Sequence, residues 1–288
     1  MRVVGALLLI ALVTTVAHTQ PLRTGQTTAF IATLSFRESR NATTNAVTVP
    51  TFRAVFCRTS TAWAPIGQEA NCRAPTNGAW TMLRNGQSLG ALSTRSNRIV
   101  SSMASIPRIA VGDERFESWL GAVHDRPLAL TTARDVRETE GWMVSRLSTN
   151  ERAIFARAFR ASVVLPHCDV TPRGVTPPAD DQFTELDISV RKVLRSAAGQ
   201  LLVGLAIDEQ RKPCDDVRDP ARTEHWFITR GDEAPHFIGN EMHVVDAFDF
   251  DSDGRTEWLF SLSRYNEDGF ILFFDAFRKS VQSTWHYH

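Results

Sequence analysis

Short runs of Val, Ile, Leu, Phe and Trp recur along most of the chain, and stretches rich in Gly, Pro, Asn and Asp separate them. Such runs favour β-strands, and the residues between them favour turns. Strands that recur with turns between them predict a mainly β fold built from β-propeller-like antiparallel blades, with a β-sandwich or two small β domains as the alternative. The predicted strands are residues 28–36, 52–58, 80–84, 87–92, 108–111, 116–120, 127–132, 186–194, 201–207, 225–229, 242–248, 256–263, 270–277 and 281–287.

One of these strands has an unusual pattern. Residues 270–274 read Phe-Ile-Leu-Phe-Phe and are apolar at every position. A strand with one face in solvent alternates apolar and polar residues, whereas a strand covered on both faces does not. We therefore predict that residues 270–274 are buried on both faces of their sheet.

A single segment has the periodicity of a helix. Ile154 pairs with Ala158, and Phe155 with Phe159, at a spacing of four residues, which places all four on one face. Ser148 precedes the segment and Glu151 follows three residues later, as in a capping box. The sequence predicts one short helix near residues 149–160 that packs on a sheet.

The clearest hairpin contains a misleading catalytic motif. Asn85 and Gly86 stand between two strand-like runs, and both tolerate the positive φ that a type I′ turn requires. Residues 86–90 also fit Gly-x-Ser-x-Gly, the nucleophile elbow, with Ser88 as the nucleophile. That elbow needs a helix after the serine, but the residues after Ser88 are strand-like. We predict that Ser88 is dispensable.

Residues 1–17 have the form of a secretory signal peptide. Arg2 supplies a positive charge, residues 3–13 are apolar, and residues 15–17 are small. The apolar run is shorter than the ~20 residues that a membrane-spanning helix needs, and no later segment is long and apolar enough to span a membrane. We predict an exported, periplasmic or extracellular protein with no transmembrane segment.

Proline divides the remaining chain. Pro172, Pro177 and Pro178 fall in one short stretch, which is typical of a loop or linker. The predicted organisation is an N-terminal β-rich region with one helix at 18–168, a Pro-rich linker at 169–183, and a C-terminal β region at 184–288.

The cysteines support export. The chain contains Cys57, Cys72, Cys168 and Cys214, and an even number in an exported protein predicts disulfide bonds. We favour Cys57–Cys72 and Cys168–Cys214 because each bond then stays within one half of the chain. A zinc site is less favoured because no Cys-x-x-Cys spacing is present.

The most specific chemistry lies in residues 249–257. Asp249, Asp251 and Asp253 alternate along a loop that continues with Gly254 and Glu257. Ca²⁺ binds six to eight oxygens, and a tight loop can supply them from alternating side chains and a backbone carbonyl, here that of Arg255. An EF-hand needs Glu at position 12 and flanking helices, whereas position 12 is Phe260 and the flanks are strand-like. The alternative to a structural Ca²⁺ site is an acidic turn without metal.

This loop resembles the calcium loop of FG-GAP/VCBS-type β-propeller repeats. The resemblance covers residues 242–287, about one blade, and includes Asp268-Gly269 before the next apolar strand. It implies side-chain ligands at Asp249, Asp251, Asp253 and Glu257 and a carbonyl ligand at Arg255. Glu257 stands where Asp is commoner in the family, and the chain has no second copy of the loop.

Charge and histidine spacing exclude several other functions. The 32 basic and 32 acidic residues give a formal net charge of zero, and no long run of one sign predicts binding to nucleic acid or an anionic membrane. The eight histidines form no His-x-x-x-His or His-Glu-x-x-His motif, so a catalytic zinc site is not indicated.

No catalytic residue can be named from the sequence, and this favours a function other than catalysis. We therefore predict a calcium- and disulfide-stabilised binding or surface-interaction module with a protein or carbohydrate ligand. A secreted hydrolase acting on carbohydrate, with two carboxylates brought together from remote positions, is the main alternative. A structural subunit of an envelope complex is the third reading.

Overall fold

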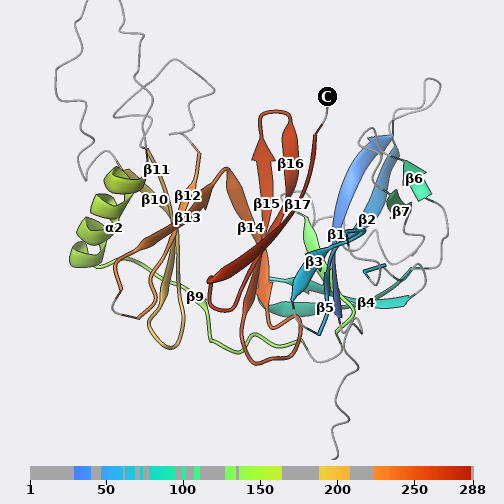
Figure 1. The fold of residues 1–288 in the computed structure, drawn as a ribbon, viewed down its shortest axis with the longest axis horizontal. Coiled ribbons are helices and arrows are strands. Elements are labelled where there is room, and N and C mark those ends of the chain that lie inside the picture. Colours follow the sequence, from blue (N-terminus) through green and yellow to red (C-terminus); the bar gives the residue numbers. More distant parts are fainter. Residues whose placement is uncertain are drawn as a thin grey trace, which may run out of the picture.

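The computed structural model describes residues 29–39, 47–60, 62–68, 72–73, 75, 78–94, 99–101, 107–110, 127–133, 136–163, 188–207, 223–231 and 233–286. Within these ranges the strands form three antiparallel sheets, and one α-helix, α2, lies at one end of the molecule (Figure 1). The predicted mainly β fold and its short helix are confirmed for the described residues. In the described part of the chain no sheet closes into a barrel, which agrees with the sandwich alternative.

The first sheet is built mostly from the N-terminal part of the chain. Its strand order is β5-β4-β8-β1-β2-β7-β6, and β3 also pairs with β2. Phe52 packs edge-on against Trp80 with 4.8 Å between ring centroids, inside a cluster of buried aliphatic residues. The strands are β1 (Ala29–Ser39), β2 (Val47–Arg58), β3 (Trp63–Pro65), β4 (Gly78–Arg84), β5 (Gln87–Thr94), β6 (Ile99–Ser101), β7 (Pro107–Ala110) and β8 (Leu128–Thr131).

The turn between β4 and β5 has the predicted chemistry. Asn85 and Gly86 adopt φ values of 50° and 76°, as a type I′ hairpin requires. Strand β5 follows directly, so Ser88 is exposed on a strand and the residues that follow it are not helical as far as Thr94. The structural basis for discounting the nucleophile elbow is therefore confirmed.

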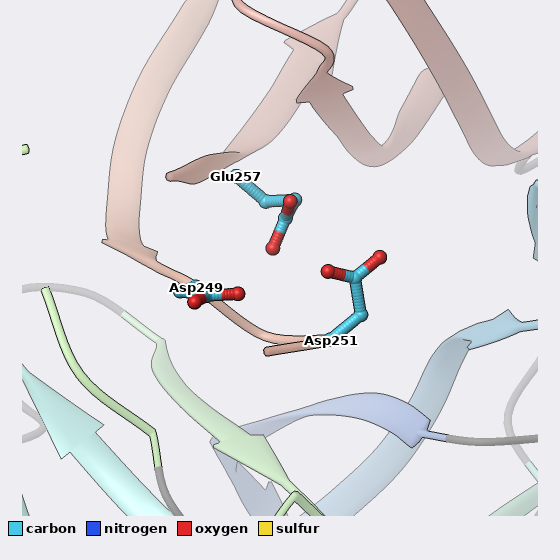
Figure 2. Close-up of side chains that lie close together, drawn as sticks. All are labelled: Asp249, Asp251 and Glu257. Carbon is cyan, nitrogen blue, oxygen red and sulfur yellow. The ribbon is translucent and has the colours of Figure 1, made fainter. Parts of the chain in front are cut away.

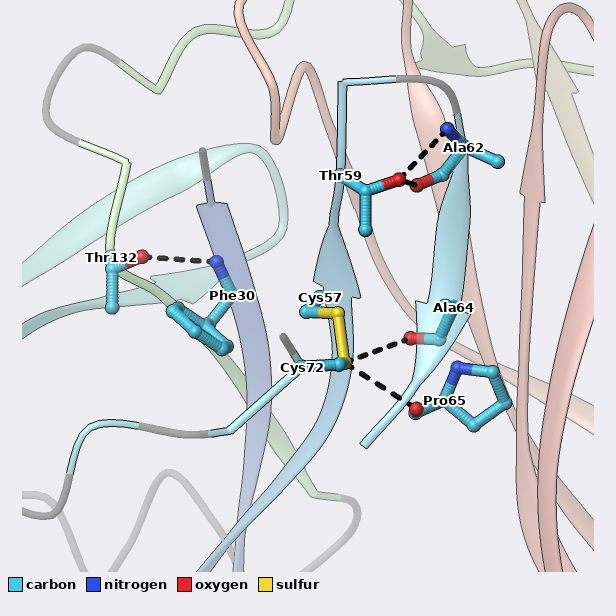
Figure 3. The surroundings of a disulfide bond; sticks show 8 residues. All are labelled: Phe30, Cys57, Thr59, Ala62, Ala64, Pro65, Cys72 and Thr132. Atoms are coloured by element: carbon cyan, nitrogen blue, oxygen red, sulfur yellow. Dashed lines mark hydrogen bonds between the residues drawn. A yellow bond between two sulfur atoms is a disulfide. The ribbon is translucent and has the colours of Figure 1, made fainter. Parts of the chain in front are cut away.

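A disulfide bond closes a short loop at the edge of the first sheet. Cys57 in β2 lies with its sulfur 1.97 Å from that of Cys72, and both residues are buried (Figure 3). The Cys72 sulfur also lies 3.4 Å from the carbonyl oxygen of Pro65 in β3. This is the pairing that we favoured. Cys168 and Cys214 lie outside the described residues, so their bond stays a prediction.

The second sheet carries the helix on one face. Phe155 and Phe159 of α2 pack with Val203 and Phe227, in the middle of a buried cluster. The capping box is confirmed, because Ser148 Oγ accepts the N–H of Glu151 and the Glu151 carboxylate accepts the N–H of Ser148. The sheet order is β13-β12-β11-β10-β9. The elements are β9 (Met143–Val144), α2 (Thr149–Ser162), β10 (Ile188–Arg195), β11 (Leu201–Ile207), β12 (His225–Ile228) and β13 (His236–Asn240).

The third sheet is a four-stranded meander that lies between the other two (Figure 1). Phe270 and Leu272 of β16 pack toward the first sheet, and Ile271 and Phe273 pack toward the second. Residues 270–274 are therefore covered on both faces, as their unbroken apolar pattern predicts. The strands are β14 (Met242–Phe248), β15 (Glu257–Arg264), β16 (Glu267–Phe274) and β17 (Lys279–His286).

Most predicted strands have a counterpart in the structure, but four short strands were missed: β3, β6, β9 and β13. The predicted strand at 116–120, the segment 1–17 and the linker at 169–183 lie outside the described residues. The domain boundary therefore stays a prediction. Strand β9 and helix α2, which precede that boundary in the sequence, belong to the same sheet and core as β10–β13.

Candidate metal centre

The acidic loop connects the first two strands of the third sheet. Strand β14 ends at Phe248 and β15 begins at Glu257. Ser252 and Gly254 adopt φ values of 61° and 86°, and these left-handed conformations bend the chain sharply between the strands. The predicted strand–loop–strand arrangement is present.

Three of the predicted ligands converge. One carboxylate oxygen from each of Asp249, Asp251 and Glu257 lies within 4.8 Å of the others. Figure 2 shows the three side chains directed toward one another from the loop and from the start of β15. The Asp249 and Glu257 residues are buried, and the Asp251 side chain is only 5% exposed.

Asp249 fixes the conformation of the loop itself. Its two carboxylate oxygens accept the N–H groups of Asp253 and Gly254, each at 2.9 Å. These bonds close the turn around the side chain that starts it. Burial raises the pKa of Asp249 even though the two N–H donors oppose that shift.

Asp251 reaches across to the first sheet. Its Oδ2 accepts the Nε–H of Arg58, which lies at the end of β2 and 193 positions away in the sequence. Its Oδ1 is buried and has no hydrogen-bond partner. Burial raises the pKa of Asp251 more than Arg58 lowers it. The free energy cost of leaving a carboxylate oxygen buried and unbonded is high unless a cation lies beside it.

Glu257 is the most perturbed of the three. It is 1% exposed, and its Oε2 accepts the N–H of Phe250 at 2.7 Å. Burial, followed by the negative charge of Asp251, raises the pKa of Glu257 to about 9. At neutral pH without a cation this carboxyl group therefore holds a proton, which relieves the repulsion among the three acids.

The other two predicted ligands have different surroundings. Asp253 Oδ1 accepts the N–H of Arg255 at 2.9 Å, and Asp253 is not one of the three converging residues. The Arg255 guanidinium forms an ion pair with Asp275 at the end of β16. The metal-binding roles of the Asp253 carboxylate and the Arg255 carbonyl stay predictions.

A segment outside the predicted motif, Arg137–Thr139, forms hydrogen bonds with the loop; we call it the crossing segment. The Asp249 N–H donates to the Arg137 carbonyl at 3.1 Å, and the Thr139 hydroxyl donates to the Gly254 carbonyl at 3.1 Å. Sequence reasoning missed this segment and Arg58, because nothing in a linear pattern connects positions more than 100 residues apart.

Another buried carboxylate lies next to the loop, and both of its oxygens accept hydrogen bonds. Asp246 in β14 is buried, and its oxygens accept the N–H groups of Asn85 at 3.0 Å, Gly86 at 3.3 Å and Ala247 at 3.0 Å. The tip of the β4–β5 hairpin is therefore attached to the third sheet through backbone donors.

The donor set suits a hard cation. All three converging side chains offer only oxygen, the ligand atom that Ca²⁺ and Mg²⁺ prefer and that zinc and copper sites use less. The group carries up to three negative charges, and within the described part of the chain Arg58 is the only cationic side chain that bonds to it. A divalent ion would supply the missing positive charge and a ligand for Asp251 Oδ1.

Comparison with known proteins adds no assignment: no family model, curated protein or solved structure matches this chain. Across the described ranges, no helix combines the length and apolar character needed to cross a membrane.

Proposed function

We propose that this chain is an exported β-rich binding module whose third sheet is braced by a structural Ca²⁺ ion. Asp249, Asp251 and Glu257 would bind the ion through carboxylate oxygens, with Asp253 and the Arg255 carbonyl completing its shell. The observation that carries the proposal is the buried, unbonded Oδ1 of Asp251 beside two further buried carboxylates.

The position of the loop explains what the ion would do. The loop joins β14 to β15, and Asp251 bonds to Arg58 of the first sheet. A cation bound there would fix the register of the meander and hold the first sheet against it. In the absence of a cation, proton uptake at Glu257 is the remaining means of reducing the repulsion.

Two features support the finer reading as a propeller-type blade. The third sheet is a consecutive four-stranded antiparallel meander, and the acidic loop falls between its first two strands. The resemblance to FG-GAP/VCBS repeats implies a calcium loop between strands of one blade, with which this arrangement agrees. Export is supported by the N-terminal segment and by the Cys57–Cys72 disulfide, since disulfides persist in oxidising compartments.

Thermal unfolding of the purified protein tests this proposal. We expect Ca²⁺ to raise the Tm, a chelator to reverse the increase, and Mg²⁺ at the same concentration to raise it less, because Mg²⁺ demands near-ideal octahedral geometry. In Asp251→Asn the Ca²⁺-dependent increase should be lost. Equal Tm values in Ca²⁺ and chelator for the parent protein would refute the metal brace.

A further inference from the structure

A concave site lies between the beginning of α2 and the outer edge of β10, away from the acidic loop. Its volume is about 580 Å³, within the range typical of ligand sites. We call it the basic cleft. Its lining consists of Val144, Ser145, Arg146, Leu147, Arg152, Val190, Arg191, Lys192 and Val193.

The charge of the basic cleft is entirely positive. Four of its lining residues are Arg or Lys, and none is acidic. The acid closest in sequence, Glu151, is already bonded to Arg195 and to the N–H of Ser148. Three arginine side chains, those of Arg146, Arg152 and Arg191, line this one cleft and would attract an anionic ligand.

Among the described residues, the outer edge of β10 is paired only near the end of the strand. Strand β9 pairs with β10 only at Leu194 and Arg195, and one further bond joins the Ser145 N–H to the Val193 carbonyl at 2.9 Å. The chain then turns into α2. In the described ranges no strand continues this ladder along residues 188–192. Such an edge can receive an extended peptide by hydrogen bonding to its backbone.

Two further details distinguish the ligand. Val144 in the cleft lining and its neighbour Met143 are 80% and 70% exposed, so they offer apolar contact to a side chain of the ligand. No aromatic residue lines the cleft, so a sugar ring would find no aromatic face on which to stack. A peptide with alternating acidic and apolar residues therefore fits this site better than an anionic polysaccharide.

We propose that the basic cleft binds an extended acidic segment of a partner protein. The segment would pair with the outer edge of β10 and place its carboxylates against Arg146, Arg152 and Arg191. This inference deepens the proposed binding function, on which it rests, by naming the surface and the class of partner. It does not depend on the occupancy of the acidic loop.

Fluorescence anisotropy with a labelled ten-residue peptide of alternating Glu and Val tests the charge requirement. We expect saturable binding that weakens about tenfold in Arg191→Glu and in Arg146→Glu, because each loses an attraction and gains a repulsion. Arg157→Glu is the matched control: it makes the same charge change at an exposed position of α2 outside the cleft lining. Equal weakening in all three variants, or tight binding of a Lys-Val peptide, would overturn the proposal.

Two more ligands test the strand pairing. The same peptide with N-methyl groups on alternate residues should bind about tenfold more weakly, because it cannot complete the ladder. An oligogalacturonate of equal charge should bind more weakly than the peptide. Unchanged affinity of the methylated peptide, or tighter binding of the oligogalacturonate, would contradict a peptide ligand.

The result separates this inference from the calcium proposal when each titration is paired with a melting curve. Absence of peptide binding by a protein that Ca²⁺ stabilises would overturn the inference alone. Peptide binding by a protein that Ca²⁺ leaves unchanged would overturn the metal brace alone.

Discussion

Two sets of buried carboxylates lie in or beside strand β14, and the protein satisfies them differently. Asp246 accepts three backbone N–H groups, two of them from the β4–β5 hairpin. A few residues later, the carboxylates of Asp249, Asp251 and Glu257 converge. One of their oxygens, Oδ1 of Asp251, is buried and has no hydrogen-bond partner. Both sets join the third sheet to the first, because Asp251 also bonds to Arg58.

The difference explains why we place the proposed cation at the loop and not at Asp246. At Asp246 the polypeptide supplies enough donors to stabilise one buried charge. At the loop, three carboxylates share too few donors, and the pKa of Glu257 rises to about 9. The contact between the first and third sheets therefore needs no added ion at Asp246. At the acidic loop the same contact depends on a proton or a cation.

Among the substitutions, the largest loss of stability is expected from Asp246→Ala. This change leaves three N–H groups without their acceptor and should reduce the free energy of unfolding by about 3 kcal/mol. Because the site needs no cation, the loss should be equal in Ca²⁺ and in chelator. Denaturant unfolding of Asp246→Ala and of Asp246→Asn, which keeps one acceptor oxygen, measures it. A loss that appears only in Ca²⁺ would show that the two sets are not independent.

Glu257→Gln should have opposite effects on stability in chelator and in Ca²⁺. In chelator at neutral pH, folding of the parent requires Glu257 to take up a proton that the unfolded chain has released, whereas Gln needs no proton, so the metal-free variant should be more stable than the parent. At a hundredfold excess of Ca²⁺ over its Kd, the variant should lose about 2.7 kcal/mol of ligand stabilisation. Glu233→Gln, at an exposed position outside the loop, is the matched control. Equal behaviour of the two variants in Ca²⁺ would argue against Glu257 as a ligand.

The metal-free protein should lose stability as the pH rises. Glu257 has a pKa of about 9 in the folded state and about 4.5 when unperturbed, so the folded state binds the additional proton between these values. The stabilisation is complete below about pH 4.5 and is lost progressively toward pH 9, at no more than ~1.4 kcal/mol per pH unit from this group. Urea unfolding in chelator at several pH values checks the sign, and Glu257→Gln should flatten the dependence. A parent protein that becomes more stable toward pH 9 would contradict this assignment.

The smallest effect is expected from Ser88→Ala. Ser88 lies on the hairpin that Asp246 anchors, but the anchoring uses the backbone N–H groups of Asn85 and Gly86. Its exposed hydroxyl accepts only a 3.4 Å bond from the Gly90 N–H among the described contacts. We expect a change within about 0.5 kcal/mol. A loss comparable to that of Asp246→Ala would mean that the hairpin contact works through side chains.

Local patterns predicted much of the fold. The capping box at Ser148, the Asn85–Gly86 turn and the apolar run at 270–274 each determine structure from neighbouring residues alone. Strand β9 was not predicted because its two exposed residues show no alternation of apolar and polar positions. Strand β13 was not predicted because it contains Gly239 and none of its five residues is fully buried.

The site was only partly predictable for a different reason. The loop motif indicated Asp249, Asp251 and Glu257, since their spacing is local. Arg58 and the crossing segment at Arg137–Thr139 meet the loop only after the sheets assemble. The satisfaction of Asp246 by a distant hairpin likewise depends on tertiary contact. Sequence thus revealed the acids, and the fold revealed how few donors surround them.

Calorimetric titration of Ca²⁺ into chelator-treated protein tests the central claim most directly. We predict one saturable site per chain, with a Kd on the order of 0.1–1 mM as in extracellular modules, and no measurable binding by Asp251→Asn. The folded molecules of Asp246→Asn should still bind Ca²⁺, because residue 246 lies outside the converging group. Absence of saturable heat in the parent protein, or unchanged binding by Asp251→Asn, would contradict the account.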